Sequence, residues 1–154
     1  MASLRLMTSF DLCTGCKTCE MVCSLRSTGG FNANKALLRI EEDRQGFGAD
    51  PVVCAQCQNP LCERACLFSA FERDERTGAI VIDSATCRGC GMCDRACPLH
   101  VIQKKGRKYV KCDLCGGDPL CVRFCPTGAI TLIDMDTGRV GTARQGDKKE
   151  GIGA

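Results

Sequence analysis

Sixteen of the 154 residues of this chain are cysteines, and they fall into four tight groups. The first and third groups share the spacing C-x2-C-x2-C-x3-C and consist of Cys13, Cys16, Cys19 and Cys23, and of Cys87, Cys90, Cys93 and Cys97. The second and fourth groups have a wider middle gap and consist of Cys54, Cys57, Cys62 and Cys66, and of Cys112, Cys115, Cys121 and Cys125. Cysteine at this density is typical of disulfide scaffolds and of metalloproteins. Either way, the groups must organise the fold.

The groups belong to an internal repeat. Residues 59–64 of the second group match residues 118–123 of the fourth, and residues 13–16 of the first match residues 87–90 of the third. A unit of two groups therefore occurs twice along the chain.

The start of the chain favours metal binding over disulfides. Only twelve residues precede Cys13, too few for the basic region, apolar stretch and cleavage site of a secretory signal. No twin-arginine pair is present, and no apolar run is long enough to cross a bilayer. We therefore expect a protein of the reducing cytoplasm, without a membrane span, in which thiolates bind metal.

The spacing within each group favours iron–sulfur clusters. In C-x2-C-x2-C the chain curls around a cubane cluster and supplies three ligands, and small residues such as Gly15, Gly89 and Gly91 permit the curl. The fourth cysteine lies one helical turn further on, points the other way and ligates a second cluster. The groups therefore work in pairs. Four groups predict four [4Fe–4S] clusters with no cysteine left over.

Zinc is the main metal alternative. Zinc sites often use two C-x2-C pairs a dozen or more residues apart, commonly together with histidine. Here the four cysteines of every group lie within fifteen residues, and the only histidine is His100. A structural zinc-binding module therefore stays an outside alternative.

The formal charge of +3 counts every cysteine as neutral. A filled cubane site adds about −2, so four filled sites would bring the charge to about −5. The lysines and arginines then compensate buried cluster charge, and we expect no nucleic-acid partner.

Between the cysteine groups the sequence predicts short elements of an α+β fold. One turn of helix is expected at each C-x3-C, over residues 19–23, 62–66, 93–97 and 121–125. Turn residues between β-prone segments predict three hairpins, formed by residues 69–73 with 79–83, 101–103 with 109–111, and 129–133 with a strand after the turn at 136–138. The run Lys104–Lys108 is interpreted as a solvated hairpin turn.

Cys97-Pro98 and the segment Cys125–Ile130 closely resemble bacterial-type ferredoxins. The resemblance implies an α+β fold of tandem ferredoxin-like lobes within residues 1–140, with short hairpins and helices around the clusters. The inner lobe would span about residues 50–110, and the outer lobe about 1–49 with 111–140. Residues 141–154 would form a C-terminal tail. Ser24 and Leu67 stand where ferredoxins usually have proline, so we expect looser chain there, or chain shaped by a partner.

The order of the four groups resembles the polyferredoxin subunits of molybdenum and tungsten oxidoreductases, formate dehydrogenases and hydrogenases. Residues 21–25 and 111–119 look most like the small subunit of tungsten aldehyde oxidoreductase complexes. This resemblance implies a large catalytic partner carrying tungsten or molybdenum, and a further flavin or ferredoxin redox partner. A free polyferredoxin, or a subunit of a formate dehydrogenase or hydrogenase, is the alternative.

The family resemblance also implies nested ligation, in which the first group pairs with the fourth and the second with the third. The four ligand sets would be Cys13, Cys16, Cys19 and Cys125; Cys112, Cys115, Cys121 and Cys23; Cys54, Cys57, Cys62 and Cys97; and Cys87, Cys90, Cys93 and Cys66. Spacing alone leaves sequential pairing open.

The chain contains no general base, nucleophile or dinucleotide-binding loop that we can identify. We therefore expect a non-catalytic electron-transfer subunit rather than an enzyme, with no catalytic residues of its own.

Overall fold

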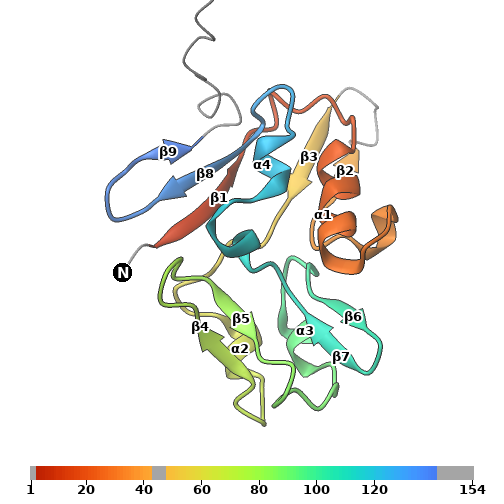
Figure 1. The fold of residues 1–154 in the computed structure, drawn as a ribbon, viewed down its shortest axis with the longest axis vertical. Coiled ribbons are helices and arrows are strands. Elements are labelled where there is room, and N and C mark those ends of the chain that lie inside the picture. Colours follow the sequence, from red (N-terminus) through yellow and green to blue (C-terminus); the bar gives the residue numbers. More distant parts are fainter. Residues whose placement is uncertain (1–2, 43–47, 142–154) are drawn as a thin grey trace, which may run out of the picture.

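The computed structural model describes residues 3–42 and 48–141 and confirms a mixed α+β fold. Figure 1 shows two groups of elements, one above the other. The upper group contains β1 (Leu4–Thr8), α1 (Thr18–Thr28), η1 (Ala33–Lys35), β2 (Arg39–Glu42), β3 (Ala49–Val52), α4 (Leu120–Arg123), β8 (Ile130–Asp134) and β9 (Val140–Gly141). The lower group contains α2 (Leu61–Arg64), β4 (Phe71–Arg73), β5 (Ile80–Ile82), α3 (Met92–Ala96), β6 (Gln103–Lys105) and β7 (Lys108–Val110). The 3-10 segment η2 (Leu114–Gly117) follows the return of the chain to the upper group.

The boundary predicted near residue 50 falls inside β3, which pairs with β2 of the upper group. Beyond Gly141, the predicted tail lies outside the described residues. None of the described helices has the length and apolar character needed to span a bilayer.

The three predicted hairpins are confirmed as the antiparallel pairs β4–β5, β6–β7 and β8–β9. Their registers place Phe71 opposite Ile82, Gln103 opposite Val110, and Ile133 opposite Val140. In the second hairpin Lys104 and Lys105 belong to β6. The turn is therefore shorter than the sequence predicts.

Two strand pairings have no counterpart in the sequence prediction. β1 pairs with β8 from Leu4 opposite Asp134 to Thr8 opposite Ile130, and β2 pairs with β3. The β1–β8 ladder joins the beginning of the chain to its last described hairpin. It thereby brings the first cysteine group near the fourth.

The four predicted helical turns are confirmed, but α1 is much longer than one turn. It covers eleven residues, whereas α3 and α4 stop before Cys97-Pro98 and Cys125-Pro126, because proline cannot continue a helix. Ser24 is fully buried; its hydroxyl donates to the carbonyl of Met21 at 2.8 Å and accepts from the Asn32 N–H at 3.0 Å. The expectation of looser chain after Cys23 is therefore wrong.

The apolar core has two parts. The upper cluster includes Leu6, Leu38, Leu114, Val122 and Ile130. The lower cluster has five buried members, Cys54, Cys93, Cys97, Val101 and Ile102, of which three are cysteines. Cysteines therefore make up most of the fully buried part of this cluster, and partly buried apolar side chains such as Phe71, Ile82 and Tyr109 pack around them.

Candidate iron–sulfur sites

Four hollows in the structure are each lined by four or more cysteines. Site I is lined by Cys13, Cys16, Cys19 and Cys125. Site II, a cavity of about 460 Å³, is lined by Cys23, Cys112, Cys115 and Cys121, with Cys54 also reaching its wall. Site III, a cavity of about 110 Å³, is lined by Cys54, Cys57, Cys62 and Cys97. Site IV is lined by Cys66, Cys87, Cys90 and Cys93. Each hollow thus takes three thiols from one group and one from another group, and site II in addition borders on Cys54, which it shares with site III.

The helices connect these sites in pairs. α1 carries Cys19 of site I and Cys23 of site II, and α4 packs against it with Cys121 of site II. In the lower group α2 and α3 pack together, and the segments that contain them carry cysteines of sites III and IV. Cys19 and Cys23 lie one turn apart along the axis of α1, so this helix serves two sites.

All four thiols of site II are desolvated. Burial raises the pKa of Cys23, Cys112, Cys115 and Cys121. Elsewhere burial raises the pKa of Cys19 to about 12 and that of Cys93 to about 11. Several thiolates this close together in a low-dielectric site need a cationic centre.

Other thiols are stabilised as thiolates by local donors. The side chain of Thr18, followed by its backbone N–H, lowers the pKa of Cys16. Burial acts to raise the pKa of Cys125, but hydrogen bonds from the Ile130 backbone and from Thr127 outweigh it and lower the pKa.

Backbone N–H groups also point at the fourth cysteines of the first two groups. Leu37 N–H donates to Cys23 Sγ at 3.3 Å, and Ala70 N–H donates to Cys66 Sγ at 3.4 Å. Such bonds stabilise negative charge on sulfur.

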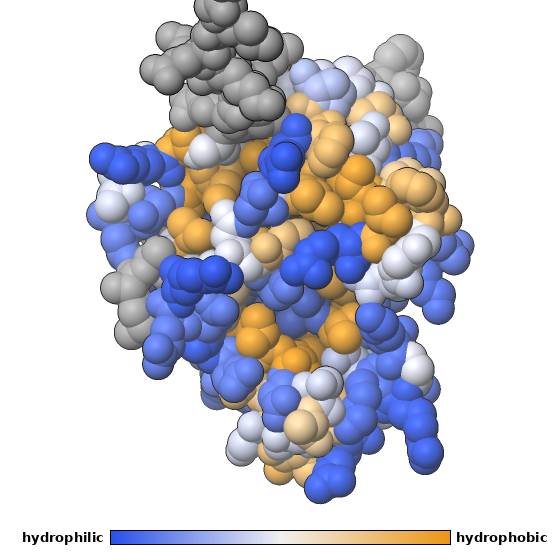
Figure 2. Space-filling view, in the orientation of Figure 1, coloured by the Kyte–Doolittle hydropathy of each residue, from blue (hydrophilic) through white to orange (hydrophobic). Residues whose placement is uncertain are grey.

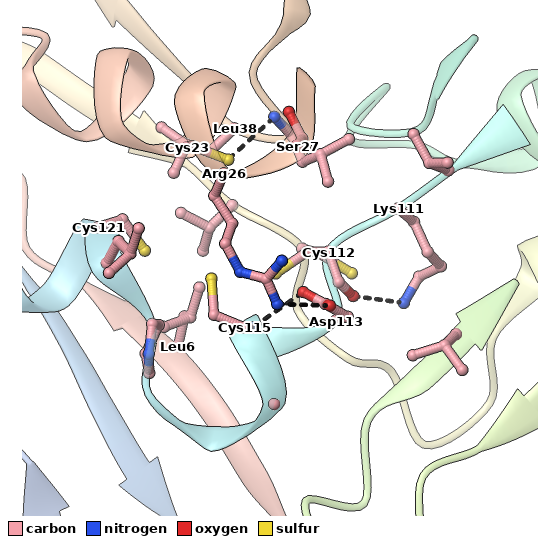
Figure 3. Close-up of a pocket in the computed structure, with 18 of the residues that line it drawn as sticks. Leu6, Cys23, Arg26, Ser27, Leu38, Lys111, Cys112, Asp113, Cys115 and Cys121 are labelled. Carbon is pink, nitrogen blue, oxygen red and sulfur yellow. Dashed lines mark hydrogen bonds and ion pairs between the residues drawn. The ribbon is translucent and has the colours of Figure 1, made fainter. Parts of the chain in front are cut away.

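One edge of site II carries an exposed ion pair. Figure 3 shows Arg26 of α1 reaching across the cavity toward Asp113 and Cys115. The Arg26 Nη2 to Asp113 Oδ2 distance is 3.7 Å. Burial raises the pKa of Cys115 and Asp113 adds to it, while the Arg26 charge acts in the opposite direction.

A buried polar cluster lies between sites II and III. Gln56 is 4% exposed; its Nε2 donates to the carbonyl of Cys112 at 2.8 Å, and its Oε1 accepts from the Ile80 N–H at 3.0 Å. Lys111, also buried, donates to the same Oε1 at 3.1 Å. Sequence reasoning missed both residues. The only signal was their position, Gln56 just before Cys57 and Lys111 just before Cys112.

The donor set of each hollow fits a cubane cluster. The donors are thiols, and the exposed His100 lines none of the four hollows. Within residues 3–42 and 48–141 no three Cys, His, Asp or Glu side chains converge tightly enough to hold a single ion. A cubane spreads its four thiolates over four irons, so its ligands stand farther apart than those around one zinc ion.

Comparison with protein families agrees with this donor set. Residues 47–135 match the 4Fe-4S dicluster domain, and residues 10–29 match a 4Fe-4S binding domain. The chain belongs to the ferredoxin-like 4Fe-4S dicluster family. Membership in this iron–sulfur family confirms the prediction of iron–sulfur chemistry.

Relatives of this 4Fe-4S protein include subunits of oxidoreductases. The chain is 38% identical over 130 residues to the polyferredoxin-like subunit of aliphatic sulfonate oxidoreductase from Pyrococcus furiosus, which covers 83% of this chain and 75% of the relative. It is 31% identical over 143 residues to the thiosulfate reductase electron transfer subunit PhsB of Salmonella typhi, and the match covers 83% of this chain and 74% of that relative. It is 28% identical to the iron–sulfur subunit of the nitrate-inducible formate dehydrogenase of Escherichia coli, and the match covers 84% of this chain and 53% of that relative.

Among solved structures, a chain of the active site complex BamBC of benzoyl coenzyme A reductase shares the fold. The TM-score is 0.52 at 21% identity, covering 96% of this chain and 83% of the other. At this identity the likeness concerns the fold of the 4Fe-4S protein alone.

Proposed function

We propose that this chain is an electron-transfer subunit that holds four [4Fe–4S] clusters, one at each of sites I to IV. The observation that carries the proposal is that all sixteen cysteines line four hollows, three of them with four thiols and site II with its four and the shared Cys54. The ligand sets are the nested ones, in which the first group pairs with the fourth and the second with the third. When bound, each cluster supplies reversible one-electron redox chemistry.

The role of the protein residues is to position the clusters, to insulate them from water and to tune their reduction potentials. The short helices hold neighbouring sites at fixed separations, because α1 packs on α4 and α2 packs on α3. Backbone donors such as Leu37 N–H and Ala70 N–H stabilise negative charge at the sulfurs. No described residue is assigned a catalytic role, so the chemistry takes place on a partner.

Exposed apolar side chains lie next to the cysteines at both ends of the molecule. Phe10, Leu12 and Phe124, all at least half exposed, flank site I in sequence, and Leu67 and Phe68 follow Cys66 of site IV, with Leu67 81% exposed. Figure 2 shows hydrophobic residues reaching the surface over much of the upper and middle parts of one face. Apolar surface of this kind is what a subunit interface buries.

The partner we propose is a large catalytic oxidoreductase subunit that carries tungsten or molybdenum, with an aldehyde oxidoreductase as the specific candidate. Support for tungsten comes from the resemblance of residues 21–25 and 111–119 to small subunits of that class. A further flavin or ferredoxin partner would exchange electrons at the other end, and we place the complex in the cytoplasm, where thiols stay reduced.

Two measurements test the proposal. Anaerobically purified protein should contain about sixteen iron and about sixteen acid-labile sulfide per chain; stoichiometric zinc without sulfide would sink it. Affinity capture from the native host under argon, followed by mass spectrometry and metal analysis, should recover a large subunit with tungsten or molybdenum. Recovery as a monomer alone contradicts the subunit assignment.

A free polyferredoxin is the second candidate. It is favoured by the 32% identity over 132 residues to an uncharacterized ferredoxin of Methanocaldococcus jannaschii. A subunit of a formate dehydrogenase or hydrogenase is the other alternative, and the metal and substrate of the captured partner distinguish them. Size-exclusion chromatography of the native extract separates the free protein from either complex.

A further inference from the structure

Lys111 is a buried lysine without a carboxylate partner. It is 6% exposed. Its Nζ donates to the Gln56 side-chain oxygen, to the carbonyl of Ile80 and, at 3.4 Å, to the carbonyl of Cys112. All three acceptors are neutral. In the part of the chain that the structure describes, no Asp or Glu forms an ion pair with this lysine.

A buried ammonium group needs an anion near it. Removing a charge from water costs several kcal/mol, and carbonyl dipoles recover only part of that loss. Lys111 lines the walls of both site II and site III. Figure 3 shows its side chain beside Cys112, a thiol of site II, and Cys62 and Cys97 line site III with it. Both neighbouring sites would carry net negative charge once filled.

We propose that Lys111 is the shared counter-charge of sites II and III and raises the reduction potential of both. This inference rests on the proposed function. A fixed positive charge favours the more negatively charged reduced state of a neighbouring site. Lys111 borders both sites, so an electron at site II and an electron at site III interact with the same cation. Electron transfer from one site to the other therefore changes the electrostatic interaction with Lys111 little.

Gln56 holds the lysine in this position. Its side-chain oxygen accepts from Lys111 and from Ile80 N–H, and its Nε2 anchors it to Cys112 of the upper group. Replacing the amide by a carboxylate would keep the outline of the side chain, remove the donor to the Cys112 carbonyl and offset the lysine charge. Gln56→Glu is therefore a second, nearly isosteric way of removing the net positive charge.

The test is a redox titration of the loaded full chain, followed by electron paramagnetic resonance, for the wild type, Lys111→Met and Gln56→Glu. We expect two of the four reduction steps to move to lower potential in Lys111→Met, the same two to move in Gln56→Glu, and the other two to stay in place. Lys105→Met is the matched control, because Lys105 lies at the rim of site II but is exposed. Water and salt screen an exposed charge, so all four steps should stay.

The inference is overturned if no step moves in either variant, or if all four move alike. A purely structural role of Lys111 would lower stability without this selective pattern of potentials. If Lys111→Met does not load, Gln56→Glu alone decides between the two outcomes. Iron and sulfide content of the wild type is measured first: failure to load there contradicts the proposed function, whereas full loading with unshifted potentials contradicts only the role of Lys111.

Discussion

The side-chain amide of Gln56 donates a hydrogen bond of 2.8 Å to the carbonyl oxygen of Cys112, which opens the last cysteine group. The same side chain accepts from Ile80 N–H of β5 at 3.0 Å. One glutamine thus ties the lower group of elements to the segment where the chain re-enters the upper group. It also holds the wall between site II and site III.

Gln56→Ala should therefore destabilise the loaded protein. The substitution leaves Ile80 N–H and the Cys112 carbonyl buried without this partner, and each such loss costs roughly 1–3 kcal/mol. We expect a loss of roughly 2–4 kcal/mol, seen as a lower thermal unfolding midpoint by anaerobic circular dichroism. Gln58→Ala, at an exposed glutamine two positions away, should have little effect; equal midpoints for the two variants would contradict the role of Gln56.

The nested ligand sets predict a long-range effect of Cys125. Cys125→Ser should change the cluster at site I, because Cys125 lines that hollow with Cys13, Cys16 and Cys19. The paramagnetic resonance spectrum should then resemble that of Cys16→Ser. A spectrum like that of Cys90→Ser would instead support sequential ligation, and one like that of Cys115→Ser would mean that Cys125 ligates the cluster of its own group.

Ser24 should be intolerant of the proline found at this place in ferredoxins. Ser24→Pro removes a helical N–H inside α1 and clashes with the preceding turn, at a cost of about 3 kcal/mol or more. Ser24→Ala leaves the Asn32 N–H without its acceptor, a loss of about 1–2 kcal/mol. Ser84→Ala should have the highest thermal midpoint of the three variants, because Ser84 is exposed. Ser24→Ala should unfold at a lower temperature and Ser24→Pro at the lowest. Wild-type stability in Ser24→Pro would refute this account of the helix length.

Gly89 should be required for site IV for steric reasons. Its φ is +72°, and a Cβ there would lie 2.0 Å from the backbone oxygen of Arg107. Gly128 is the matched control, because its φ is +73° and a Cβ added there would meet nothing within 4 Å.

Gly128→Ala should cost about 1–2 kcal/mol from left-handed backbone strain, whereas Gly89→Ala should in addition displace the loop that carries Cys87 and Cys90. We expect Gly89→Ala to lose up to a quarter of the iron and sulfide, about four atoms of each, and Gly128→Ala to keep its full content. Equal metal content in both variants would show that the β6–β7 turn yields to the added methyl group.

Removal of iron and sulfide should unfold the lower group of elements. Three of the five buried members of its core cluster are cysteines, and the apolar side chains around them, such as Phe71, Ile82 and Tyr109, are only partly buried; we therefore expect metal binding to be coupled to folding. After anaerobic chelation, amides of β4 to β7 should lose their protection from hydrogen exchange, and reconstitution should restore it. Protection that survives in the apo protein would show that side-chain packing alone holds these strands.

Several features of the fold follow from local sequence. Turn residues between β-prone segments, such as those at 136–138, predicted the three hairpins, and the one-turn spacing of cysteines predicted the four helices. These elements depend on interactions between residues that are close together in the sequence, so the sequence alone is enough to predict them. The β1–β8 ladder was not predictable in this way, because nothing in Leu4–Thr8 states which distant strand it will pair with.

The length of α1 is an intermediate case. The missing proline at position 24 was visible in the sequence, but its consequence was not. Burial of Ser24 and its bond to Asn32 N–H depend on the chain folding back after the helix.

The sixteen cysteines by themselves determined the chemistry of this protein, because thiolate spacing decides which metal centre a loop can surround. The sequence did not decide which groups share a hollow. That came from the β1–β8 pairing and from the packing of α1 on α4 and of α2 on α3. Nor did it reveal that Lys111 and Gln56 lie buried between sites II and III. Burial and contact between distant segments arise only when the chain folds, so only the tertiary structure showed that the Lys111 charge lies between sites II and III.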